Sequence, residues 1–336
     1  MAQPDTLTLG PLKRLVMLGW SELFIDIERW CDSRGIETRI LTSPDQEPNF
    51  ADLPLKVLTV RSVSNSRVHS YVREGVESSG LLALSFGARW IVSAERSLAL
   101  FDGKLLNAHG TRLPLDRGAG GFSWRILRGD RIGNLLLHLV DEGIDTGPIV
   151  RADGYVIPPS CRTPAEISDD YVRRLRGFVL DFLSEIHKKA VVFPLLHQPE
   201  YLSTYFPRLL TAEHAWIDWQ EAPQEIERFI LAFDTPYAGA MTYLNDRKVR
   251  LCSAQMHIGE PGHHPFQTGL VLRKSTDWLL IALRDQYALI VERLEDDEGR
   301  SVIDSVKIGD RLHTPYELLD AARRLRVTIG PTGVKR

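Results

Sequence analysis

The sequence predicts an α/β protein with two domains: a mostly parallel N-terminal sheet with helices on both faces, and a smaller β-rich, barrel-like C-terminal domain. In the first half, short apolar runs alternate with helix-length segments, and strands joined by such crossovers pair in parallel. After about residue 190, short strand-like runs between turn residues indicate a small barrel or an open antiparallel sheet. The 336 residues suffice for two domains that each bury a core.

Apolar periodicity predicts the elements of the first half. Runs of apolar residues predict strands at 15–18, 36–41, 57–60, 81–86, 105–107 and 135–140. After the first strand, a helix capped by Ser21 is expected to bury Phe24, Ile27 and Cys31 and to end at Gly35.

Two further helices are predicted before residue 190. Apolar residues recur at helical spacing over 68–76. Thr163 and Glu166 form a capping box with Pro164 in the first turn, and the apolar stripe that follows runs to Ile186. These elements define a first domain of residues 1–190.

The second half is predicted to begin with a linker. Three prolines interrupt residues 191–207, which show no clear periodicity, and the C-terminal domain is expected to span 208–336. One helix is predicted at 224–233 and another at 315–325. Between them the strand-like runs are 239–244, 249–256, 269–272, 278–283 and 288–294.

Composition excludes several classes of protein. Forty-one Lys and Arg against 44 Asp and Glu give a net charge of −3, which argues against nucleic acid as the main partner. Three scattered cysteines indicate free thiols in a reducing compartment. No apolar run is long enough to span a membrane, and the first residues do not resemble a signal peptide. We therefore expect a cytoplasmic protein that does not bind membranes.

Common catalytic and nucleotide-binding motifs are missing. The sequence has no Walker A loop and no GxSxG elbow. The glycines of 118–121 follow Pro114 and not the first strand, so they are not a dinucleotide-binding fingerprint. The adjacent His263 and His264 are better explained as loop residues than as metal ligands, and no metal is expected.

The most informative stretch runs from residue 107 to 147. Asn107 and His109 end a predicted strand with their side chains on the same side, and Asp145 lies in an acidic, glycine-bounded loop after another strand. Polar residues at the carboxyl ends of parallel strands line the ligand crevice, so the three groups could converge. Alternatively, Asn107 caps a turn, His109 is a surface imidazole and Asp145 belongs to an Asx turn.

Two longer matches favour the functional interpretation. Residues 107–118 (NAHGTRLPLDRG) resemble the pattern N-x-H-G-S-L-L-P-x-x-R-G, and residues 141–147 (DEGIDTG) match D-x-G-x-D-T-G. Both patterns occur, in this order and spacing, in the 10-formyltetrahydrofolate-dependent formyltransferases, which the chain therefore resembles. Residues 85–91 look like the segment whose backbone meets the pterin, and 217–219 and 233–240 resemble the start of the C-terminal barrel of the longer members.

The resemblance implies a Rossmann-like catalytic domain, an OB-like C-terminal domain and N-formyltransferase activity with 10-formyltetrahydrofolate as co-substrate. It implies that Asn107 hydrogen-bonds the formyl oxygen, that His109 is the general base and that Asp145 orients its ring. Arg117 is expected to shape its loop. The residues expected to line the pterin slot are Phe86, Gly87, Arg89, Trp90, Ile91, Val140, Asp141 and Glu142.

Departures from the family patterns bear on the acceptor. Thr111 replaces the usual Ser and Arg112 an apolar residue. The turn at 19–22 lacks the glycines of the glycinamide ribonucleotide branch. Residues 42–55, where methionyl-tRNA formyltransferases carry a basic insertion, contain no Lys or Arg. From residue 191 onward, 17 basic residues face 20 acidic ones, which is a poor surface for tRNA.

We therefore expect a small-molecule amine as acceptor, most of all a nucleotide-linked amino-dideoxy sugar used for surface polysaccharide. Hydroxyornithine for siderophores and methionyl-tRNA are the alternative acceptors. A non-enzymatic alternative is a folate-binding regulatory protein, against which the complete trio argues. The resemblance leaves open whether the protein is a homodimer.

Overall fold

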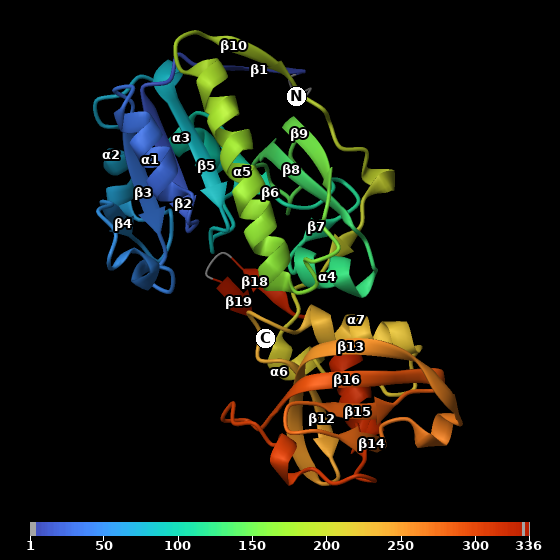
Figure 1. The fold of residues 1–336 in the computed structure, drawn as a ribbon. Coiled ribbons are helices and arrows are strands. Elements are labelled where there is room, and N and C mark those ends of the chain that lie inside the picture. The colour runs from blue at the N-terminus through green and yellow to red at the C-terminus, as the bar shows by residue number, and fades with distance from the viewer. Residues whose placement is uncertain (1–4, 331–332, 336) are drawn as a thin grey trace.

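The computed structural model describes residues 5–330 and 333–335, with side chains from 5 to 327, and has two domains (Figure 1). Residues 1–4, 331–332 and 336, which the predicted domain boundaries include, lie outside the described part. A seven-stranded sheet forms the centre of the N-terminal domain and a six-stranded sheet that of the C-terminal domain. The predicted fold class is confirmed.

The seven-stranded sheet is mostly parallel, as predicted, but its last two strands are not. Its order is β4 (Val57–Thr59), β3 (Glu37–Thr42), β2 (Arg14–Gly19), β5 (Leu81–Phe86), β6 (Leu105–His109), β8 (Ile132–Leu139) and β9 (Ile149–Val156). Pairs from β4 to β6 are parallel, whereas β6–β8 and β8–β9 are antiparallel. The segment between β6 and β8 contains one short helix, which packs on other helices and does not cross the sheet, so β8 runs in the opposite direction.

The α-helices of the described residues are α1 (Phe24–Asp32), α2 (Ser66–Arg73), α3 (Ala94–Phe101), α4 (Gly121–Leu127), α5 (Pro164–Ile186), α6 (Thr211–His214), α7 (Pro223–Ala232) and α8 (Tyr316–Arg324). Short 3-10 helices lie at Glu47–Phe50, Ser78–Gly80, Glu200–Leu202, Pro265–Gln267 and Ile303–Ser305. The helices predicted around residues 24–35, 68–76, 164–186, 224–233 and 315–325 are therefore present.

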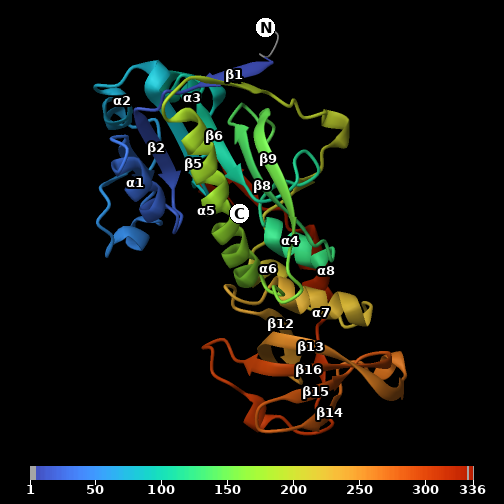
Figure 2. The ribbon, with the colours of Figure 1, turned by 45° about the horizontal axis from the view of Figure 1, so that its top comes forward.

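Helices cover both faces of the seven-stranded sheet because successive strand residues point to opposite sides. Leu15 and Met17 of β2 pack with α1 and α5 on one face, and Val16 and Leu18 pack with α2 and α3 on the other. Figures 1 and 2 show these two helical layers. The alternation explains why all the residues of β2 are buried.

The helix boundaries follow mostly from the sequence. α1 buries Phe24, Ile27 and Cys31 as predicted. The expected cap is displaced, because α1 begins at Phe24 and the Ser21 hydroxyl accepts the Leu23 N–H, at 3.3 Å, before the helix starts. α5 begins with the predicted capping box of Thr163 and Glu166.

The segment expected to be an irregular linker, 191–207, pairs with the N-terminal domain. β10 (Val191–Pro194) forms an antiparallel ladder with β1 (Thr6–Leu9). β11 (Tyr205–Phe206) pairs in parallel with β7 (Arg117–Gly118), which ends the 107–118 motif. The segment that leads to the second domain is therefore bound to the first.

The six-stranded sheet is antiparallel and contains all five strands predicted for this half. Its order is β14 (Val271–Lys274), β15 (Leu279–Ala282), β16 (Asp285–Glu295), β13 (Arg247–His263), β12 (Ala240–Leu244) and β17 (Leu312–His313). The sheet curls until its ends meet, and the Leu312 N–H donates to the Gly269 carbonyl at 2.8 Å. A hairpin of β18 (Thr328–Gly330) and β19 (Gly333–Lys335) follows α8.

The sequence predicted no membrane-spanning segment, and it predicted that the three cysteines are free thiols. Among the helices of residues 5–330, none is long and apolar enough to cross a bilayer. Cys31, Cys161 and Cys252 are free thiols, as expected, with Cys31 and Cys252 buried.

Candidate active site

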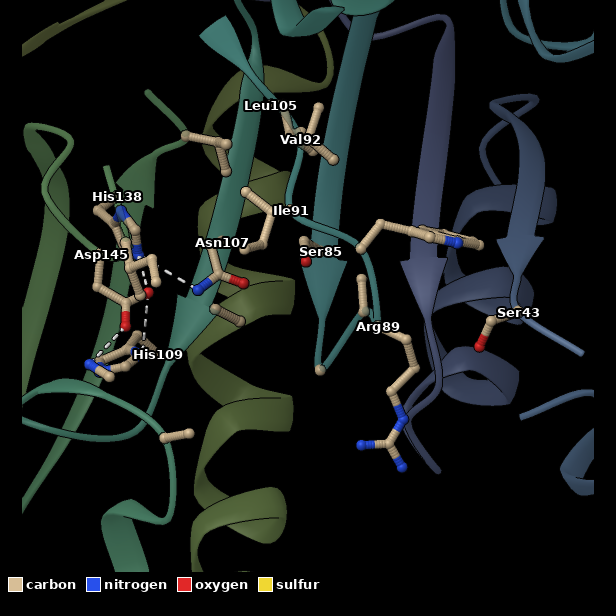
Figure 3. A pocket seen from close by; sticks show the side chains of 18 of the residues that line it. Ser43, Ser85, Arg89, Ile91, Val92, Leu105, Asn107, His109, His138 and Asp145 are labelled. Carbon is tan, nitrogen blue, oxygen red and sulfur yellow. Dashed lines mark hydrogen bonds and ion pairs between the residues drawn. The ribbon is translucent and has the colours of Figure 1, made fainter. Parts of the chain in front are cut away.

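A cavity of about 940 Å³ lies where β5 and β6 end (Figure 3). Its lining includes Asn107, His109 and Asp145, the three residues predicted to be catalytic. Small-molecule sites commonly have volumes of about 300–1,000 Å³, so the cavity has the size of a small-molecule site, and the three residues lie in its wall.

The pairing of β6 with β8 determines the surroundings of Asn107. Asn107 and His109 are two residues apart on β6 and project from the same face. The antiparallel register puts His138 of β8 directly opposite Asn107, and Asn107 Nδ2 lies 3.2 Å from His138 Nε2. A buried histidine thus lies beside the predicted oxyanion donor.

Asp145 reaches the same place by a route that the sequence did not predict. It was expected at the carboxyl end of a parallel strand, but β8 is antiparallel to β6, and the loop between β8 and β9 folds back so that Asp145 contacts His109 of β6 and His138 of β8. Asp145 has a φ of +56°, which aspartate tolerates better than most residues. Gln198 Nε2 donates to the Asp145 carbonyl at 3.0 Å and to that of Gly147 at 2.7 Å, and so holds the loop.

The Asp145 carboxylate is shared by three partners. Its Oδ1 lies 3.7 Å from His109 Nδ1 and 3.6 Å from His138 Nε2, and its Oδ2 accepts the Gly118 N–H at 2.9 Å. Burial alone would raise the pKa of Asp145, but the positive charge of His109 and His138 in their protonated forms and the Gly118 N–H outweigh it and hold the pKa well below its ordinary value. Asp145 is therefore ionised at neutral pH.

His109 is held on its other side by Thr111. The Thr111 hydroxyl donates to the Asp116 carbonyl at 2.6 Å, and His109 Nε2 lies 2.5 Å from the same hydroxyl and 3.3 Å from that carbonyl. Because a carbonyl only accepts, this arrangement places a proton on Nε2. Burial lowers the pKa of His109, and the Asp145 charge opposes that effect. The unprotonated Nδ1 then faces a carboxylate that would stabilise its protonated form.

Of the eight residues expected to line the pterin slot, six line the cavity. Gly87, Arg89, Trp90, Ile91, Val140 and Asp141 line the cavity. The other two do not line the cavity: the centroid of the Phe86 ring lies in the core, 5.4 Å from that of Phe24, and Glu142 is exposed on the loop. Whether either residue contacts folate stays a prediction. Folate binding by the six residues stays a prediction.

Sequence reasoning missed other residues of the cavity. His138 is the single polar residue of the apolar run 135–140, which was the available signal. Arg61 and Arg208 also line the cavity, and within the described residues neither has an ion-pair partner. Arg208 comes directly after the 191–207 segment, and no periodicity pointed to it.

Two arginines of the 107–118 motif are bound within the protein. Arg112 Nη2 contacts Asp130 Oδ2 at 2.6 Å. Arg117, expected to shape its loop, is buried and contacts Glu200 Oε2 at 2.7 Å. Neither side chain is among those that line the cavity.

His109, His138 and Asp145 also have the composition of a metal site. One possible ligand atom of each residue lies within 4.8 Å of those of the other two. Among the described residues, no other group of three His, Cys, Asp or Glu side chains has this spacing. The hydrogen bonds and ion pairs described above account for their proximity. The expectation that no metal is bound stays a prediction.

Comparisons with known proteins support the resemblance. The family model for the formyl transferase C-terminal domain matches residues 209–304. A methionyl-tRNA formyltransferase of Ruminiclostridium cellulolyticum is 27% identical over 63% of this chain, and the match spans 66% of that relative, slightly less than two thirds. One of Neisseria meningitidis is 27% identical over 80% of this chain and 82% of the relative.

A solved structure has the same architecture. The N-formyltransferase of Helicobacter canadensis, in complex with folinic acid and dTDP-3-aminofucose, aligns with 84% of this chain and 99% of its own, with a TM-score of 0.62 and 17% identity. At that identity the likeness concerns the fold. Taken with the two sequence motifs, the matching C-terminal family model and the aligned relatives, it supports a formyltransferase family for this chain.

Proposed function

We propose that this protein transfers a formyl group from 10-formyltetrahydrofolate to a primary amine. The observation that carries the proposal is the convergence of Asn107, His109 and an ionised Asp145 on one wall of a cavity of about 940 Å³. A pure folate-binding protein would not need this set. The Helicobacter canadensis relative in fold is complexed with folinic acid, which supports a reduced folate as donor.

The reaction follows from the proton positions. The amine nitrogen attacks the formyl carbon, and the carbonyl oxygen becomes an oxyanion next to Asn107, whose Nδ2 can donate to it. With Nε2–H held by Thr111 and Asp116, His109 accepts the amine proton at Nδ1, 3.7 Å from Asp145. The intermediate then expels tetrahydrofolate: the bond from carbon to N10 breaks, and His109 returns the proton to N10.

For the acceptor we propose a nucleotide-linked amino-dideoxy sugar. Arg208 lines the same cavity as Gly118 and Asp145, and within the described residues it has no ion-pair partner, so it is available to a phosphate. The structural relative that binds dTDP-3-aminofucose supports this acceptor class.

Methionyl-tRNA is the second candidate acceptor, because the sequence relatives are named methionyl-tRNA formyltransferases. Ion pairs on the C-terminal sheet argue against it. Arg247 contacts Asp296 at 3.0 Å, and Lys248 and Arg250 contact Asp297 at 3.3 and 2.9 Å. Each of these cations already has a partner within the sheet, which it would have to leave in order to pair with a phosphate of the tRNA backbone.

The experiment is an acceptor screen with the purified protein and 10-formyltetrahydrofolate. The acceptors are a dTDP-linked amino-dideoxy sugar, hydroxyornithine and charged initiator tRNA, and the readout is the mass gained by each. We expect formylation of the sugar with weak salt dependence. Efficient formylation of the tRNA with a steep salt dependence would reject the sugar assignment. Donor binding without transfer to any amine would favour the regulatory alternative.

A further inference from the structure

His138 takes no part in the reaction steps described above. It lies on β8 opposite Asn107, is only 2% exposed and forms part of the cavity wall. In an antiparallel pair, two residues directly opposite each other project from the same face and contact each other. Figure 3 shows the imidazole between Asn107 and Asp145.

The backbone fixes which nitrogen of His138 carries the proton. Its Nδ1 lies 2.8 Å from the Leu139 carbonyl, which can only accept, so Nδ1 is the donor. In the neutral ring Nε2 is then an acceptor. It faces Asn107 Nδ2 at 3.2 Å and accepts one of its two hydrogens.

This contact fixes the orientation of the Asn107 carboxamide. If the amide turned over, its oxygen would face the bare Nε2, and two acceptors would meet in a buried site. The Asp145 carboxylate, 3.6 Å from the same nitrogen, adds a further acceptor that repels the amide oxygen. The amino end of Asn107 is therefore kept on the catalytic side, with its second N–H free for the formyl oxygen.

We propose that His138 is a positioning residue that fixes the rotamer of Asn107 and so pre-organises the oxyanion donor. The inference rests on the proposed formyl transfer. A preorganised donor contributes more than one that must turn over during the reaction, because the cost of orienting it is met during folding.

The test compares two substitutions at His138. Gln at 138 keeps an acceptor that Asn107 can use, whereas Leu removes it. We expect His138→Leu to lower kcat about 10–100-fold, the range for groups that orient a reactive residue, with KM for the donor changed less than about threefold. His138→Gln should recover most of the loss. His69→Leu, at an exposed histidine of α2, is the matched control and should leave kcat unchanged.

A double-mutant cycle separates positioning from a purely structural role. If His138 acts through Asn107, His138→Leu should lower kcat less than about twofold once Asn107 is Ala. Equal losses in both backgrounds would overturn the proposal, as would a Gln variant no better than Leu at equal melting temperature.

A second readout does not depend on turnover. The side-chain amide signals of Asn107, assigned by their loss in Asn107→Ala, should shift in the NMR spectrum of His138→Leu and stay close to wild type in His138→Gln. Unchanged signals in His138→Leu would refute the positioning role. If the wild type transfers no formyl group, the proposed function fails, and the spectra still decide whether His138 orients Asn107.

Discussion

Replacing Asp145 with Asn removes one negative charge and little volume, so it isolates the electrostatic part of the proposed mechanism. The imidazolium that forms when His109 takes the amine proton lies 3.7 Å from the carboxylate, and both side chains are less than 15% exposed. With an effective dielectric constant of about 20, unit charges at that separation attract by about 4.5 kcal/mol. Since about 1.4 kcal/mol corresponds to a tenfold change in rate, we expect kcat to fall roughly 10³-fold.

The same substitution has a defined effect on pH dependence. Burial lowers the pKa of His109 below its ordinary 6.5, and the Asp145 charge raises it again. Without that charge the pKa falls further. Because His109 must be unprotonated to accept the amine proton, the acid limb of kcat/KM should move to lower pH in Asp145→Asn, while the plateau falls.

The assay is steady-state formyl transfer between about pH 5 and 9, with the formylated acceptor measured by mass. Melting temperature and donor binding are measured on the same preparations. Asp153→Asn, at an exposed position of β9, removes an equal charge away from the cavity and should behave as wild type. Turnover of a folded Asp145→Asn protein within about threefold of wild type would refute the reasoning, as would an acid limb displaced to higher pH.

Four further predictions test the other groups of the site. Asn107→Ala should lower kcat about 10²–10³-fold with donor binding retained, checked by turnover and folate titration. His109→Ala combined with Asp145→Asn should be little worse than the worse single variant, because the two groups act on one proton; additive losses would contradict this. Thr111→Val, which removes the hydroxyl that holds His109 Nε2, should cost about tenfold in kcat, and Thr111→Ser should restore it. Arg208→Ala should raise KM for a phosphorylated acceptor about tenfold and leave KM for the donor unchanged, measured by varying each substrate in turn.

The sequence alone predicted the elements whose cause is local. α1 buries Phe24, Ile27 and Cys31 because their spacing matches the helical period, and α5 begins at a capping box made by neighbours on the chain. The C-terminal strands were visible as apolar runs between turns. The three candidate catalytic residues were also predicted from short motifs, because each motif consists of residues that are close together on the chain.

Contacts between distant segments were not predictable in this way. The sequence of residues 132–139 does not indicate that β8 is antiparallel to β6, because the direction of a strand depends on the path of the chain that precedes it. The β10–β1 and β11–β7 pairings join segments too far apart on the chain for any local pattern to record. The same limit explains Phe86: a buried strand alternates faces, and only the assembled sheet shows that this ring faces α1 and not the cavity.

For the site, the sequence determined which groups are present, and the tertiary structure decided which of them act on one another. The local strings supplied an amide, an imidazole and a carboxylate. The cross-strand register added His138 to that set, and the returning loop brought Asp145 within 4 Å of both rings. Register and loop closure are set by packing over the whole domain, whereas residue type is set position by position, and for that reason the chemistry was predictable before its geometry.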